Sequence, residues 1–216
     1  MIVYFISGLG ADERAFRYIR LPEVETRFIH WVPPQRQETL QQYTSRLLDQ
    51  IDTNQSVVLV GLSFGGIVAQ ELANMIDCVR LFLISSVKHP KELSPLLQAV
   101  KRSRIYKLLP FPWVKPIVSY AAPYWFNTVS DRQRTLLRSV INDTDNQFAQ
   151  WAIETIMQWE GEPSQTPVVH LHGNQDRIFP IRYVENCIAV EGAGHFMVVT
   201  HAKKISKLIH KYLNQQ

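Results

Sequence analysis

The sequence predicts an α/β protein: a mostly parallel sheet of about six strands flanked by helices. Short apolar runs rich in Val, Ile, Leu and Phe alternate with segments whose apolar residues recur at helical spacing. Chemically active side chains follow three of these runs, and open parallel sheets gather such groups at their carboxyl edge. A chain of 216 residues with 46% hydrophobic residues is long enough to bury a sizeable core.

Each expected strand is a short apolar run with the β-branched and aromatic content of a buried strand. The runs are residues 2–6, 26–32, 56–60, 79–85, 166–173 and 186–190. Helical spacing follows from Leu40 to Ile51, after Gly65, and from Ile205 to Tyr212. The lysines of the last segment are interpreted as a solvated helix face.

The pentapeptide Gly61-Leu62-Ser63-Phe64-Gly65 directly follows the third run and opens a helical pattern. A serine on a sharp strand-to-helix turn needs neighbours without a Cβ atom, because strand and helix must approach closely. Ser63 is therefore the candidate nucleophile. Ser85 and Ser86 lie at the end of another run, where they could line the site, but they lack flanking glycines.

A serine needs a base to remove its proton, and the base needs a group to orient it. Asp176 follows the fifth run and His195 follows the sixth, so both are expected at the edge that holds Ser63. His172 ends the fifth run and is expected to shape that turn, with the site as its alternative. Acids and histidines elsewhere are interpreted as structural or surface groups: Asp77, Asp143, Asp145, His30, His170, His201 and His210.

These motifs resemble those of the α/β-hydrolase superfamily of serine hydrolases, and the resemblance covers nearly all of the chain. Gly-Leu-Ser63-Phe-Gly matches the nucleophile motif, Gly173-Asn-Gln-Asp176 the acid motif, and Gly192-Ala-Gly194-His195-Phe the histidine motif. The resemblance, to a small carboxylesterase-like member, implies that Asp176 orients His195, which activates Ser63.

Ser7-Gly8-Leu9-Gly10 lies where the superfamily has His-Gly-x-Gly. The resemblance implies that the backbone N–H groups of Leu9 and Phe64 form the oxyanion hole. The match is partial, because Ser7 stands where histidine is common. The chain begins at what would be the family's third strand, which implies a minimal core.

From residue 88 to residue 161 helical spacing replaces the alternation, so the core is expected in 1–87 and 162–216. The insert resembles the family's cap or lid, which narrows the site and sets substrate preference. Its aromatic and proline-rich middle is expected to line an acyl pocket or to pack the cap on the core. Candidate substrate contacts are His89, Trp113 and Trp125.

The charge of the insert is uneven. Between Lys88 and Lys115 there are seven basic residues and one acid, a net of +6, against +4 for the whole chain. This run is interpreted as a solvated surface, or as a docking site for an anionic part of the acyl substrate or for anionic lipid. No nucleic-acid recognition motif accompanies it, so nucleic acid is not an expected partner.

The resemblance implies a hydrolase that cleaves a carboxylic ester or thioester of a small or medium acyl substrate. Two alternatives stay open: a catalytically silent binding protein or receptor of the same fold, and a lyase or C–C hydrolase.

No cofactor or metal is expected, since Cys and His show no metal-ligand spacing. Two cysteines, a short first run and the lack of a basic leader favour a cytoplasmic protein without a transmembrane segment. The residues leave the oligomeric state open.

Overall fold

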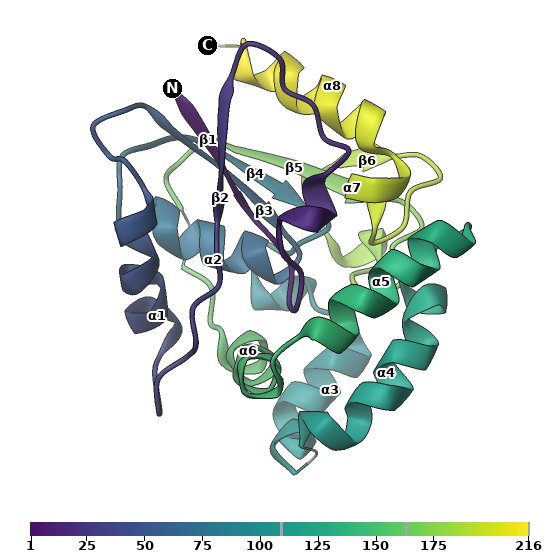
Figure 1. Ribbon diagram of the computed structural model, residues 1–216. Helices are drawn as coiled ribbons and strands as arrows, with labels where there is room; N and C mark the ends of the chain where they lie inside the picture. Colours follow the sequence, from purple (N-terminus) through teal and green to yellow (C-terminus); the bar gives the residue numbers. More distant parts are fainter. Residues whose placement is uncertain (109, 163, 216) are drawn as a thin grey trace.

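A computed structural model describes residues 1–108, 110–162 and 164–215. Its centre is a six-stranded sheet in the order β2-β1-β3-β4-β5-β6, in which every pairing is parallel (Figure 1). The strands are β1 (Ile2–Ile6), β2 (Glu25–Ile29), β3 (Val57–Leu62), β4 (Cys78–Ile84), β5 (Val168–Gly173) and β6 (Ile188–Val190). The predicted fold class is confirmed.

Helices cover both faces of the sheet, and the central strands β1 and β3 are buried along their whole length. On one face Tyr4 and Leu59 pack in a core with α1 (Leu40–Leu47) and α2 (Phe64–Ala73). On the other, Phe5 and Val60 pack in a second core with α7 (Met197–Thr200) and α8 (Ala202–Leu213). Neighbouring residues of β1 thus enter different cores, because successive strand side chains alternate between faces.

Between β4 and β5 every described element is helical, and these helices lie together beside the sheet, below it in Figure 1. The α-helices are α3 (Pro95–Ser103), α4 (Phe111–Trp125), α5 (Asp131–Asp143) and α6 (Asn146–Gln158). We call residues 88–161 the helical insert. Within it α4 packs on α5 and α6, and α6 also contacts α2 of the core.

The short 3-10 helices are η1 (Glu13–Phe16), η2 (Leu48–Gln50), η3 (Pro90–Glu92), η4 (Ile105–Lys107) and η5 (Ile181–Tyr183). Local hydrogen bonds set several boundaries. Thr39 and Gln42 form a capping box at the start of α1. The second expected strand reached residue 32, but β2 ends at Ile29. Beyond it, the hydroxyl of Tyr43 bonds both the N–H and the carbonyl of Val32, at 3.1 and 2.9 Å.

Cys187 was expected in the sixth strand, but β6 begins one residue later and the Cys187 side chain is half-buried. The described part of the chain contains no helix that is both long and apolar enough to span a membrane.

Candidate active site

Ser63 lies on the sharp turn between β3 and α2, with a φ of 51° and a ψ of −120°. This positive φ is strained for a residue with a Cβ atom, and such strain gathers at functional sites. The glycines make the turn possible. A Cβ atom on Gly65 would lie 2.2 Å from the carbonyl oxygen of Ser7, and one on Gly61 would lie 2.4 Å from that of Gly65. The strand, the turn and the helix therefore approach more closely than any other residue type would allow.

A chain of hydrogen bonds joins the three residues selected from the sequence. Ser63 Oγ lies 2.9 Å from Nε2 of His195, and Nδ1 of His195 lies 2.7 Å from Oδ2 of Asp176. An ionised carboxylate only accepts hydrogen bonds, so Nδ1 of a neutral His195 carries the proton and Nε2 accepts from the Ser63 hydroxyl. The arrangement can remove a proton from Ser63 when its oxygen attacks.

Backbone groups fix the orientation of the Asp176 carboxylate. Its Oδ1 atom accepts from the N–H groups of Ile178 and Phe179, each at 2.9 Å. Its Oδ2 atom is thereby directed toward His195. The side chains of Asp176 and His195 are buried, whereas Ser63 is half-buried at the surface of a cavity. Burial keeps water from competing for these hydrogen bonds.

The topology explains how distant residues meet. Ser63 follows β3, Asp176 follows β5 and His195 follows β6. Since these strands are parallel members of one sheet, their carboxyl ends lie along the same edge.

The two expected oxyanion donors lie next to Ser63. Phe64 is the first residue of α2, where a backbone N–H has no partner inside the helix. Leu9 lines the same cavity as Ser63, in a loop so close that a Cβ atom on Gly8 would lie 3.3 Å from Cβ of Ser63. Ser7, the departure from the family motif, donates its hydroxyl proton to the carbonyl of Ala11 at 2.5 Å. Ser7 therefore closes this loop without a histidine.

An apolar cavity of about 260 Å³ opens beside Ser63 and His195. Its walls come mainly from the helical insert and from the loops that carry the acid and the histidine. The apolar lining residues are Leu9, Ala11, Leu62, Phe111, Val118, Phe126, Leu137, Val140, Ile141, Ile153, Ile156, Ile178, Phe179 and Phe196. Thr144 also lines the cavity, but its hydroxyl is bonded to the carbonyls of Gly10 and Val140. The cavity therefore suits a hydrocarbon group next to the serine.

A pair of buried histidines supports the acid loop. Nε2 of His172 donates to the carbonyl oxygen of Phe179 at 2.7 Å and lies 3.5 Å from Asp176. Its Nδ1 atom lies 3.3 Å from Nε2 of His170, which lies 3.1 Å from the carbonyl of Ser86. Because a carbonyl only accepts, both Nε2 atoms carry the proton.

The hydroxyl of Ser86 in turn donates to the carbonyl of Ser63 at 2.7 Å. The loop after β4 and the acid loop after β5 are thus linked through hydrogen bonds to the nucleophile turn. His172 shapes its turn, as expected from the sequence. The linking role of His170 and Ser86 was not foreseen, although a His-x-His pattern places both rings on one side of a strand.

Both histidines are held neutral. Burial, the largest cause, lowers the pKa of His170 from 6.5 to about 3, and the nearby His172 and Lys88 act in the same direction. Burial also lowers the pKa of His172, although the charge of Asp176 opposes this shift. The neutral rings can keep the donor and acceptor pattern described above.

The three candidate substrate contacts lie outside the cavity. His89 precedes η3, where its Nδ1 atom accepts from the N–H of Lys91 at 3.1 Å. Trp113 is exposed on the outer side of α4, and Trp125 lies near the end of that helix beside Asn174 and Arg177. The insert residues that line the cavity are aliphatic or phenylalanine, apart from Thr144.

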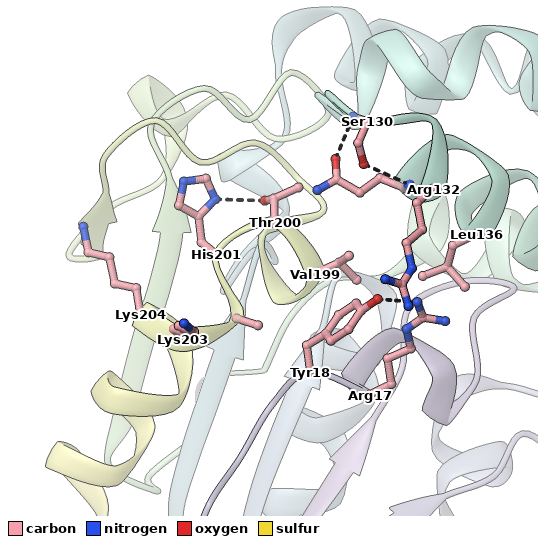
Figure 2. Close-up of a pocket in the computed structure, with 12 residues that line it drawn as sticks. Arg17, Tyr18, Ser130, Arg132, Leu136, Val199, Thr200, His201, Lys203 and Lys204 are labelled. Atoms are coloured by element: carbon pink, nitrogen blue, oxygen red, sulfur yellow. Dashed lines mark hydrogen bonds between the residues drawn. The ribbon is translucent and has the colours of Figure 1, made fainter.

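A larger hollow of about 620 Å³ lies on the other side of α5 (Figure 2). Leu136 lines this hollow, whereas the next residue, Leu137, lines the cavity. The cationic residues that line the larger hollow are Arg17, Arg132, Lys203 and Lys204. His201 bonds Thr200 at 2.8 Å, but no carboxylate among the described lining residues could orient the ring. In the described residues no group of His, Cys, Asp and Glu is arranged to hold a metal ion.

A serine on a strand-to-helix turn, joined to a histidine and an acid at the carboxyl edge of a parallel sheet, is the arrangement of an α/β hydrolase. The chain belongs to the Alpha/beta hydrolase family, whose model matches residues 3–208. The predicted membership is confirmed. No curated protein matches the chain significantly.

Solved structures share the fold at low sequence identity. An esterase from Exiguobacterium antarcticum is 16% identical with a TM-score of 0.77, over 100% of this chain and 92% of that one. A bromoperoxidase from Bacillus anthracis is 17% identical with a TM-score of 0.72, over 99% and 92% of the two chains. A hydrolase from Oleispira antarctica is 16% identical with a TM-score of 0.73, over 99% and 91%. These likenesses concern the fold alone.

Proposed function

We propose that this protein is a serine hydrolase that cleaves the carboxylic ester or thioester of a small or medium acyl substrate. The observation that carries the proposal is the hydrogen-bonded series Asp176–His195–Ser63 at the wall of an apolar cavity. Family membership supports a hydrolase, and the esterase among the structural neighbours has the same fold.

In the proposed reaction Ser63 Oγ attacks the acyl carbonyl carbon while Nε2 of His195 takes the hydroxyl proton. Asp176 stabilises the imidazolium that forms. The tetrahedral intermediate collapses when the C–O or C–S bond to the leaving group breaks, and His195 gives that group its proton. Water, deprotonated by the same histidine, then attacks the acyl-enzyme, releases the acid and restores Ser63.

The N–H groups of Phe64 and Leu9 are the proposed oxyanion donors. Each donor of this kind is worth about 3 kcal/mol in the transition state, because it is directed at charge that develops there. Phe64 is held rigidly: its buried ring stacks on Trp31 with 5.6 Å between ring centres.

The helical insert is the proposed cap. Its residues form much of the cavity wall, so they exclude water from the acyl group and limit its length. Three of the seven basic residues of the Lys88–Lys115 run donate to backbone carbonyls: Lys88 to Glu185, Lys101 to Trp159, and Lys115 to Asn142 and Thr144. These three lysines therefore have structural partners, so an anionic substrate group would have to be bound by the other four basic residues of the run.

A reducing compartment such as the cytoplasm is the proposed location. Cys78 and Cys187 are free thiols, and burial raises the pKa of the Cys78 thiol to about 11. A protonated, buried thiol is inert toward disulfide exchange and would stay free in any compartment, so the proposal depends on the half-buried Cys187.

The test is a series of p-nitrophenyl esters from acetate to decanoate. We expect kcat/KM to rise with chain length by about fourfold per methylene, as each CH₂ enters apolar surroundings, until the cavity is full. Ser63→Ala should lower kcat by about 10⁴-fold or more. Ser45→Ala, an exposed serine on α1, is the matched control and should retain full activity. Turnover that survives in Ser63→Ala, or none in folded wild type, would contradict the proposal; the second result would favour a binding protein.

A further inference from the structure

Helix α4 carries apolar side chains on two opposite sides. Val118 lines the cavity on one side. On the other, Trp113, Ile117, Tyr120 and Tyr124 recur at helical spacing and are exposed by 77%, 68%, 81% and 63%. We call these four residues the outer stripe. Its spacing makes it a continuous surface along the helix, and not four isolated exposures.

The composition of α4 is unusual for a helix with an exposed face. Lys115 is the only charged residue in the 15-residue helix. Its Nζ atom donates to the carbonyls of Asn142 and Thr144, each at 2.8 Å, so it leaves the outer stripe without a charge. A helix that is apolar all round is normally covered on every side. The outer stripe therefore has the composition of a surface that is covered in use.

Cationic side chains lie on one flank of this surface and in the segment that precedes it. Arg104 and Lys107 are exposed in the segment that leads into α4. On the flank, Arg134, Arg138 and Arg177 line a shallow hollow together with Tyr120 and Tyr124 of the outer stripe. None of the described residues that line this hollow is acidic.

One guanidinium packs directly against the outer stripe. The Arg177 side chain lies 4.1 Å from the centre of the Tyr124 ring and donates to the Tyr124 carbonyl at 2.6 Å. Asp131 pairs with Arg134 at 3.4 Å, but this contact balances only one of the cations. The surroundings of the stripe remain positively charged.

We propose that the outer stripe docks the protein on an anionic lipid surface. Tryptophan and tyrosine suit the headgroup region, because each has an apolar ring and a polar tip. The arginines and lysines add attraction to anionic headgroups. A second copy of this chain is a poorer occupant, since self-pairing would bring two positive faces together. Docking through the stripe places the acyl cavity on the far side of the same helix.

Vesicle flotation tests the proposal with phosphatidylcholine alone and with roughly one third phosphatidylglycerol added. We expect wild type to float with the anionic vesicles, and less so as salt is raised. Ile117→Ser combined with Tyr120→Ser should lower partitioning into both vesicle types by roughly tenfold or more. Arg134→Gln combined with Arg138→Gln should lower partitioning only into the anionic vesicles, by roughly 30-fold. Val79→Ser, an exposed apolar residue on β4, is the matched control and should float like wild type.

Hydrolysis of a soluble short-chain ester, measured alongside flotation, separates this proposal from the proposed function. Both double variants should keep wild-type turnover, since none of their four residues lines the cavity. Wild type that does not float, or an Ile117→Ser/Tyr120→Ser protein that floats equally well, would overturn the docking proposal whatever the esterase result. A wild-type dimer that this variant dissociates, in sedimentation equilibrium, would overturn it too, because the stripe would then be covered by a second copy.

Discussion

Replacing His170 with glutamine should flatten the dependence of stability on pH in weak acid. The buried imidazole has a pKa of about 3 in the folded protein, against 6.5 when exposed. Between these values the unfolded chain holds a proton at this position and the folded protein does not. The stability that depends on a neutral His170 is therefore fully present above pH 6.5 and is lost as the pH falls toward 3.

The magnitude follows from the shift. At about pH 5 the solution lies roughly 1.5 units below the unfolded pKa, so this histidine alone costs about 2 kcal/mol relative to about pH 7. Glutamine does not titrate, and its amide can still donate to the carbonyl of Ser86. His170→Gln should thus lose about 2 kcal/mol less than wild type over this interval.

Urea unfolding gives the change in unfolding free energy between the two pH values for wild type and for His170→Gln. Subtracting one change from the other removes the contribution of groups that titrate alike in both proteins. Equal losses in wild type and His170→Gln would refute the argument that this ring is buried in its neutral form.

Three further results are expected. Asp176→Asn should lower kcat by about 10⁴-fold with little change in fold: its oxygen can still accept from the N–H groups of Ile178 and Phe179, so the amide nitrogen would face His195 and impose the wrong tautomer. Gly65→Ala should cost about 3 kcal/mol or more in urea unfolding, because the new Cβ atom would lie 2.2 Å from a backbone oxygen; wild-type stability would contradict the turn geometry. Val140→Phe should fill part of the 260 Å³ cavity and shift the ester preference to shorter chains, by about fourfold per methylene excluded, with acetate hydrolysis unchanged. An unshifted chain-length profile would show that the acyl group binds elsewhere.

Much of the fold and the positions of the reacting residues could be predicted from the sequence, because both depend on local rules. A buried run, a glycine-flanked serine and a helical pattern together specify the turn at Ser63. Asp176 and His195 could be selected because each directly follows a strand of a parallel sheet. The structure places Ser63 and Asp176 each within hydrogen-bond distance of His195.

Other parts of the site depend on contacts between distant elements, which spacing does not reveal. The aromatic spacing of α4 is compatible with either side of the helix facing the cavity. The structure turns Val118 inward and leaves Trp113 exposed. Similarly, His170 gains its role only because β4 and β5 pair, which brings the carbonyl of Ser86 to its ring. Lys88 also looks like a surface charge until its partner carbonyl after η5 is known.

Labelling with a fluorophosphonate, with the adduct located by peptide mass, tests the central claim most directly. The claim is that His195 activates Ser63 as a nucleophile beside an accessible cavity. We expect wild type to carry the adduct on Ser63, His195→Ala to label far more slowly, and Ser63→Ala to carry none at that peptide. An unlabelled wild-type protein that is folded, or an adduct on another serine, would contradict the account.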